Sequence, residues 1–181
     1  MAARRELIGG NEHRVISIVP YDPSWPAMFD EHRSRIAAAL GSRAIRIDHI
    51  GSTAVPDLAA KPIIDIDLSV DDPEVEASYV PTLESAGYSL RVREPDHRML
   101  RTASGDVHVH VCAAGGEWER RHLLFRDWLR NDEADRRLYA EAKSVLGGRQ
   151  WQDMNAYAEA KTDVIAEITE RAERWALTLS P

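Results

Sequence analysis

Residues 63–70 constrain the fold more than any other part of this sequence, because apolar and other residues alternate along them. Successive side chains of a β-strand point to opposite faces, so every second residue from Ile64 to Val70 should lie on a buried face. Asp65 and Asp67 fall on the other face, roughly 7 Å apart at the backbone. Two carboxylates at that spacing suit one or two hard cations. Two interpretations of Asp65 and Asp67 stay open here: catalytic, metal-binding acids, or the solvent face of a half-exposed strand.

A glycine turn, Gly51-Ser52-Thr53, stands shortly before this strand. Glycine lets the backbone approach a ligand closely, and successive N–H groups at such a turn can bind an anion. A turn of this kind beside two carboxylates predicts a phosphate-binding site with a metal ion. His49 either contacts a phosphate here or packs at the end of its strand. Lys61 is either a phosphate contact or an ordinary loop lysine.

The remaining pattern predicts an α/β protein with its helices gathered at the end of the chain. We expect strands at 44–50, 63–70, 88–93, 97–102 and 107–112, helices at 24–40 and 73–86, and further helices at about 118–130, 132–146 and 151–176. The domain prediction is a flexible tail at 1–13, an α/β core at 14–116, and a helical part at 117–181. We expect this last part to pack on the core as one structural unit.

The composition limits the possible partners and the compartment. A net charge of −7 argues against a general coat for long nucleic acids, which need a basic surface. Cys112 is the single cysteine, so no internal disulfide can form, which fits a reducing cytoplasm. No apolar run approaches the ~18 residues of a membrane span, and none follows the N-terminal arginines as in a signal peptide. The expectation is a cytoplasmic protein with no membrane partner.

Residues 107–112 alternate in the same way as the acidic strand, and His108 and His110 share one face. Two interpretations stay open: metal ligands, or the polar face of a hairpin. Neutral imidazole suits zinc, iron or nickel better than magnesium. Arg101, on the preceding predicted strand, is within reach of the same cleft. His110 is also our candidate for a catalytic base, because a neutral imidazole can accept a proton.

Three motifs resemble the GrpB family, which lies within the nucleotidyltransferase superfamily. They are His-Ile-Gly-Ser-Thr at 49–53, Lys-Pro-Ile-Ile-Asp-Ile-Asp at 61–67 and Phe-Arg-Asp-Trp-Leu-Arg at 125–130. The resemblance runs from about 15 to 175. It implies a nucleotidyltransferase-like mixed sheet flanked by helices, with a C-terminal helical part that walls the active cleft. It also implies Mg²⁺ (or Mn²⁺) at the two acids, and nucleotide contacts from Arg126, Lys143 and Lys161. Tyr157 either stacks on a base or packs between helices.

The leading functional prediction is a metal-dependent nucleotidyltransferase-like protein that moves a nucleotidyl group from an NTP to a small acceptor. One alternative is a non-catalytic nucleotide- or metabolite-binding module. Members of the resembled family occur fused to dephospho-coenzyme A kinase, which makes a link to coenzyme A metabolism relevant. A weaker alternative is a metallohydrolase that uses histidine and aspartate ligands: Asp65, Asp67, His108 and His110.

Overall fold

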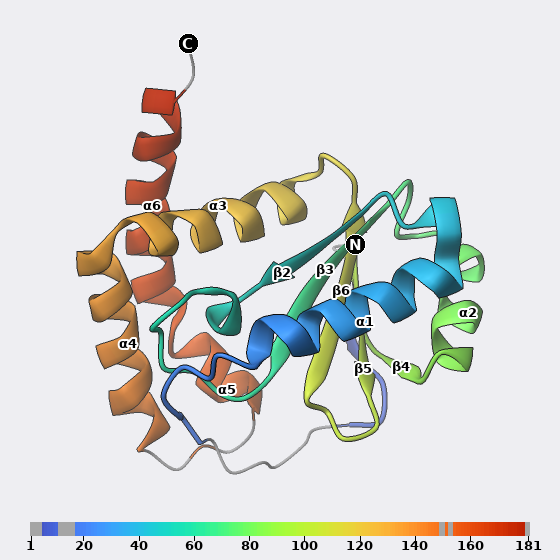
Figure 1. Cartoon of the computed structure of the whole chain (residues 1–181), viewed down its shortest axis with the longest axis horizontal. Coiled ribbons are helices and arrows are strands. Elements are labelled where there is room, and N and C mark those ends of the chain that lie inside the picture. Colours follow the sequence, from blue (N-terminus) through green and yellow to red (C-terminus); the bar gives the residue numbers. More distant parts are fainter. Residues whose placement is uncertain (1–4, 11–16, 149–150, 152–153, 180–181) are drawn as a thin grey trace.

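The computed structural model describes residues 5–10, 17–148, 151 and 154–179 (Figure 1). Within these residues the strands form one mixed sheet in the order β1-β4-β5-β6-β3-β2. Only β3 and β6 run parallel, and the other neighbours are antiparallel. The strands are β1 (Glu6–Leu7), β2 (Arg46–Ile50), β3 (Ile64–Val70), β4 (Tyr88–Glu94), β5 (His97–Thr102) and β6 (Val107–Ala113). The predicted α/β class is confirmed.

The alternation of β3 builds the main core on one face of the sheet. Ile64, Ile66 and Leu68 are fully buried, as the pattern predicted. They pack in one cluster with Ile36 and Leu40 of α1 (Trp25–Leu40), which crosses this face in Figure 1. Residues of α2 (Val80–Ser85) join the same cluster. The opposite face of β3, which carries the acids, is thereby left for the C-terminal helices.

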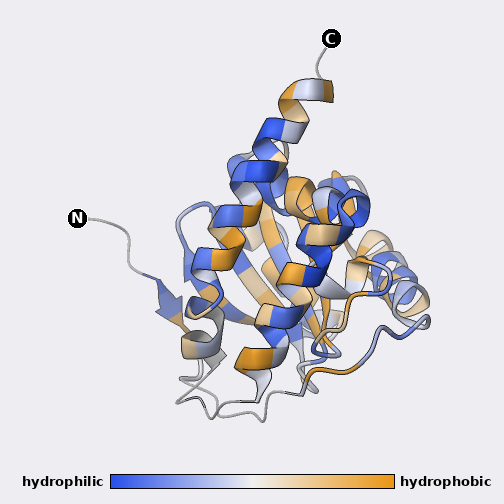
Figure 2. Cartoon of the chain, turned by 90° about the vertical axis from the view of Figure 1, so that its left-hand side faces the viewer, coloured by the Kyte–Doolittle hydropathy of each residue, from blue (hydrophilic) through white to orange (hydrophobic). Residues whose placement is uncertain are grey.

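The C-terminal helices form a second apolar cluster against the segment that follows the glycine turn. They are α3 (Glu117–Asn131), α4 (Glu133–Gly147), α5 (Met154–Glu159) and α6 (Thr162–Leu179). Leu129, Tyr139 and Ile168, from three of these helices, pack with Val55 and Leu58. Figure 2 looks onto this side and shows hydrophilic and hydrophobic residues interleaved along the helices, as amphipathic packing requires. None of the helices in the described ranges is long and apolar enough to cross a membrane.

In the first half of the chain, the structure adds detail to the sequence predictions at the N-terminus and at residues 73–86. Glu6–Leu7, within the expected tail, pair with β4, because that edge of the sheet offers free backbone groups. Val19 pairs with Ala60 in an isolated bridge. The helix expected at 73–86, which Pro81 is expected to kink or split, is indeed divided, into a short 3₁₀ turn, Glu76–Ser78, and α2. Pro81 stands in the first turn of α2, where proline is tolerated, and so marks a start.

The long C-terminal helix expected at 151–176 is divided between α5 and α6. Neither glycine nor proline stands at the break, so no local signal in the sequence indicates it. The break sets Lys161 just before α6, where it reaches the cavity described below.

Candidate functional site

A cavity of about 610 Å³ lies between the acidic face of the sheet and the C-terminal helices. Ten residues that the sequence predicted for the site line it: Gly51, Ser52, Thr53, Lys61, Asp65, His108, His110, Lys143, Tyr157 and Lys161. The turn and the two strands supply one wall. The three C-terminal helical segments α3, α4 and α5–α6 supply the other, so the cavity exists only when both parts are packed together.

The glycine turn is shaped by its own backbone and by two arginines of α3. Gly51 has φ +68°, a conformation that favours glycine, and a Cβ built on it would lie 2.7 Å from Asp65 Oδ2. Arg126 donates to the carbonyl of His49 (3.1 Å), and Arg130 donates to the carbonyl of Ala54 (2.8 and 2.9 Å). The Phe-Arg-Asp-Trp-Leu-Arg segment therefore holds both ends of the turn.

Replacing Gly51 with alanine should lower the free energy of unfolding by about 1–3 kcal/mol, because the residue is strained and its Cβ meets Asp65. Urea unfolding of wild type and variant measures this loss. Gly41→Ala is the matched control: Gly41 also has positive φ (+57°), but a Cβ there meets nothing within 4 Å. Equal losses for the two variants would contradict a role for the Asp65 contact.

Lys143, on α4, is buried against the Gly51-Ser52-Thr53 turn. Its ammonium donates to Ser52 Oγ (2.9 Å) and to the carbonyl of Ala59 (2.5 Å), and it lies 4.7 Å from the ring centroid of Tyr139. Burial, helped by the charges of Lys161 and Lys61, lowers the pKa of Lys143 to about 7. An anion beside Lys143 would stabilise the charged form of this side chain and raise its pKa again.

The amino groups of Lys61 and Lys161 both lie over the same aromatic ring, that of Tyr157. Their Nζ atoms are 4.8 and 4.7 Å from the centroid of Tyr157, a ring that is itself fully buried. Burial lowers the pKa of Lys161, against an opposing effect of Asp65. The lysine end of the cavity therefore brings three amino groups together, with that of Lys143 buried.

Asp65 meets two histidines at the other end of the cavity. Asp65 Oδ1 lies 3.4 Å from both His108 Nδ1 and His110 Nε2, and one ligand atom from each residue lies within 4.8 Å of the others. Burial by itself would raise the pKa of Asp65, but the two imidazoles outweigh it and hold this pKa well below its usual range. Burial opposes the charge on His110, yet Asp65 raises the pKa of His110 above its ordinary value.

The other ring nitrogen of His110, Nδ1, contacts His97, which in turn contacts the carboxylate of Glu94. His97 Nε2 lies 3.1 Å from His110 Nδ1, and His97 Nδ1 lies 2.8 Å from Glu94 Oε1. A carboxylate only accepts, so His97 Nδ1 carries a hydrogen and His97 Nε2 accepts the hydrogen of His110 Nδ1. Because Asp65 likewise only accepts, His110 Nε2 donates its hydrogen to Asp65 in the metal-free protein, and a metal ion bound at this nitrogen would replace that hydrogen.

The structure separates the two acids that the alternation grouped together. Asp65 lines the cavity, whereas Asp67 is completely buried, and both of its carboxylate oxygens lie 2.9–3.0 Å from Nδ1 of His122. His122 comes from α3 and covers Asp67, with its own ring lining the cavity. Asp67 thus reaches the site through His122. Only the packing of α3 on β3, distant in sequence, brings this pair together.

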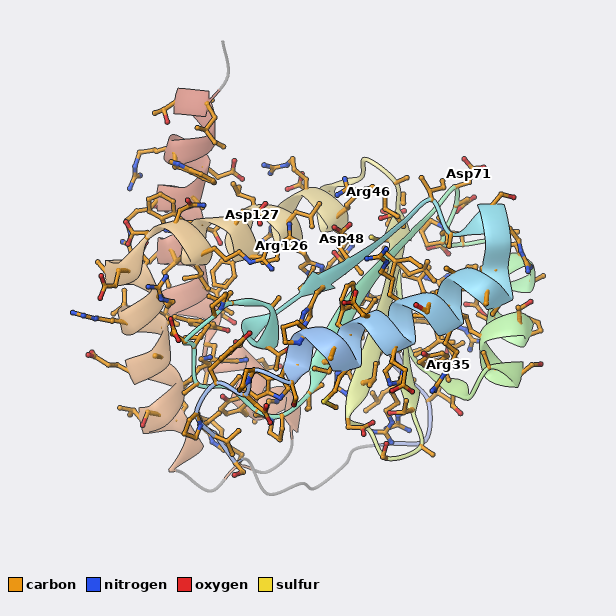
Figure 3. The ribbon with its side chains drawn as sticks, viewed as in Figure 1. Arg35, Arg46, Asp48, Asp71, Arg126 and Asp127 are labelled. Atoms are coloured by element: carbon orange, nitrogen blue, oxygen red, sulfur yellow. The ribbon has the colours of Figure 1, made fainter. Side chains whose placement is uncertain are left out.

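Three predicted binding residues do not line the cavity. His49 is buried, its ring stacks on Phe29 at 4.8 Å, and burial lowers its pKa to about 4, so it is a neutral packing residue. Arg126 lies beside Asp48 and Asp127 (Figure 3), where it supports the turn from outside. Arg101 pairs with His108 across β5 and β6 but lies outside the lining.

Several lining residues were not assigned to the site from the sequence. Tyr139 and a set from α3 contribute side chains: Trp118, Arg121, His122 and Phe125. The spacing of the α3 set, at intervals of three and four, indicates one face of a helix. The spacing thus predicts that these side chains share a helix face, but it does not predict whether that face lines a cavity or packs in an apolar core.

The mixed sheet, the Gly-Ser-Thr turn and the cavity that three lysines and three histidines line define an α/β protein with a candidate site between its sheet and its C-terminal helices. The chain belongs to the GrpB family: it matches the family described as GrpB protein over residues 15–171. It is 50% identical over 167 residues to UPF0157 protein SCO7215 of Streptomyces coelicolor, covering 92% of this chain and 89% of that protein. The predicted family is confirmed.

A solved structure and a kinase extend the comparison. The crystal structure of conserved protein GrpB from Enterococcus faecalis superposes with a TM-score of 0.78 at 30% identity, covering 88% of this chain and 99% of that one. A protein of Mycobacterium tuberculosis named dephospho-CoA kinase is 31% identical over 188 residues, which covers 88% of this chain but 46% of the kinase. This chain thus resembles one part of a longer protein in that case.

Proposed function

We propose that this protein binds a nucleotide in the cavity and transfers its nucleotidyl group to a small acceptor. One observation carries the proposal: the whole sequence contains three lysines, Lys61, Lys143 and Lys161, and all three line this cavity. Other basic positions are arginine, so the lysines are concentrated where compact, desolvated ammonium groups can meet phosphate oxygens. The Gly51–Ser52–Thr53 turn adds backbone N–H groups to the same end.

The proposed step uses groups of this chain in distinct roles. The acceptor's hydroxyl oxygen forms a bond to the α-phosphorus, the bond from that phosphorus to the bridging oxygen breaks, and pyrophosphate leaves with the electron pair. The three lysines neutralise the charge that develops on the phosphates. The hydroxyl proton goes to Nε2 of His122, because Asp67 engages Nδ1 and fixes that tautomer. This assignment moves the role of base from His110, our expectation from the sequence, to His122.

The donor set does not fit the Mg²⁺ (or Mn²⁺) that the resemblance implied. Such ions prefer oxygen ligands, and Mg²⁺ is usually bound in near-octahedral geometry by one or two carboxylates, water and substrate phosphates rather than by imidazole. Here Asp65 faces the cavity together with two imidazoles, while Asp67 lies beneath His122. We therefore derive no step through Mg²⁺.

A second candidate function is a binding module without turnover, linked to coenzyme A metabolism. The observation that favours it is the similarity to one part of proteins named dephospho-CoA kinase. In that case the lysines would hold the phosphates of a nucleotide or a coenzyme A precursor, and His122 would be a packing residue.

Calorimetric titration with each NTP and with dephospho-coenzyme A, followed by pyrophosphate release with a panel of small acceptors, tests both candidates. Nucleotide binding with pyrophosphate release supports the transferase. Binding of either ligand without release supports the module. If neither ligand binds the folded protein, the lysine cavity is not a phosphate site and both candidates fail.

A further inference from the structure

We propose that Asp65, His108 and His110 form a site for a divalent transition metal of the zinc class, in place of a magnesium site. The residues supply two imidazole nitrogens and one carboxylate oxygen from two adjacent parallel strands, β3 and β6. Imidazole is a preferred ligand of Zn²⁺, Ni²⁺ and Fe²⁺, whereas magnesium selects oxygen. The inference does not depend on nucleotide binding, and it is tested with metal alone.

The spacing of the donor atoms matches such an ion. Zinc lies about 2.0–2.1 Å from histidine nitrogen and carboxylate oxygen, and in a tetrahedral site this places neighbouring donor atoms roughly 3.3 Å apart. Asp65 Oδ1 lies 3.4 Å from His108 Nδ1 and 3.4 Å from His110 Nε2. Two of the three donor pairs therefore already have this spacing, and because all three donor atoms lie within 4.8 Å of one another, small side-chain rotations would close the set around one ion.

The surroundings of His110 are those of a metal ligand. A histidine that binds zinc commonly donates its other ring N–H to a carboxylate, a carbonyl or another polar group, which fixes its tautomer and ring orientation. His110 Nδ1 meets His97 Nε2 at 3.1 Å, and His97 in turn meets Glu94 at 2.8 Å. His97 is buried, and Trp118 stacks on it with centroids 4.3 Å apart. A buried chain of hydrogen bonds whose members are all satisfied is rigid, so it fixes the orientation of His110.

The site remains open on one side. All three donor residues line the cavity, so three protein ligands leave a further coordination position for water or a bound ligand. Three protein ligands with an open position are typical of catalytic zinc sites, whereas structural sites are closed by four. The lysine end of the same cavity would bring an anion next to the ion.

The test is calorimetric titration of the chelator-stripped full chain with Zn²⁺ and, separately, with Mg²⁺. We expect one Zn²⁺ per chain, bound at least ~100-fold more tightly than Mg²⁺. Wild-type protein that binds no Zn²⁺, or that binds Mg²⁺ equally well, overturns the proposal whatever the nucleotide experiments show. This wild-type comparison does not depend on the folding of any variant.

Substitutions of the proposed ligands and of their neighbours test where the ion binds. His108→Ala and His110→Ala should each weaken Zn²⁺ binding by ~100-fold or more, and Glu94→Gln, which touches the ion only through His97 and His110, by about 10–100-fold. His32→Gln is the matched histidine control, since His32 lies on α1 and contacts Tyr88. Asp67→Asn should leave Zn²⁺ affinity near that of wild type. If Asp67→Asn abolishes Zn²⁺ binding while His108→Ala and His110→Ala retain it, the ion binds at Asp65 and Asp67, and the proposed histidine site is wrong.

Discussion

Replacing Asp67 with asparagine should lower the rate of nucleotidyl transfer by about 10²–10⁴-fold while leaving nucleotide affinity nearly unchanged. Asp67 is fully buried and makes its side-chain contact with His122 Nδ1. An asparagine of the same shape can donate to that nitrogen, which moves the imidazole hydrogen to Nε2 and removes the proton acceptor from the cavity. His122→Ala should lose a similar amount. The measurement is pyrophosphate release with the acceptor that supports turnover.

Asp71→Asn is the matched control for the loss of a carboxylate. Asp71 directly follows β3, is exposed, and lies away from the helices that cover the site (Figure 3). Its rate should match that of wild type. Melting curves identify any variant whose rate falls through unfolding. A folded His122→Ala protein with the rate of wild type would contradict the role of His122 as proton acceptor.

Replacing Lys143 with methionine should weaken nucleotide binding by about 10–100-fold, the effect of losing one charge-assisted contact. Methionine keeps the length and apolar character of the stem, so the packing against Tyr139 is largely retained. Arg137→Met, on the exposed face of the same helix, removes a positive charge outside the cavity and should leave affinity unchanged. Calorimetric titration of both variants separates a local contact from general electrostatic attraction.

The pH dependence gives a second measurement on Lys143. Its pKa is about 7 in the free protein, against an ordinary value of 10.5, so the side chain is largely uncharged above that pH. A bound phosphate favours the charged form and raises this pKa again. Binding above pH 7 must therefore take up a proton, and affinity should fall by up to about tenfold per pH unit between roughly pH 7 and 9. Lys143→Met should lose this dependence; a variant that keeps it would assign the proton to another group.

Much of the fold could be predicted from local patterns. The alternation in β3 and β6 predicts strands and their buried faces, because side chains of a strand must alternate whatever surrounds it. The Gly51 turn could be predicted because only glycine readily accepts the backbone conformation it needs. Breaks and edges were less predictable: β1 depends on an open sheet edge, and the break before Lys161 has no breaker residue.

The candidate site divides in the same way. Local patterns place the candidate residues on particular strands: Asp65 and Asp67 on one, His108 and His110 on another, and a glycine turn before them. Which of these side chains face the cavity depends on contacts between elements that are distant in the sequence. The packing of α3 on β3 covers Asp67 with His122, and the packing of α4 and α5–α6 on the turn brings all three lysines into one cavity. Alternation fixes the face on which a side chain lies, but the element that packs on that face determines whether it is covered or open.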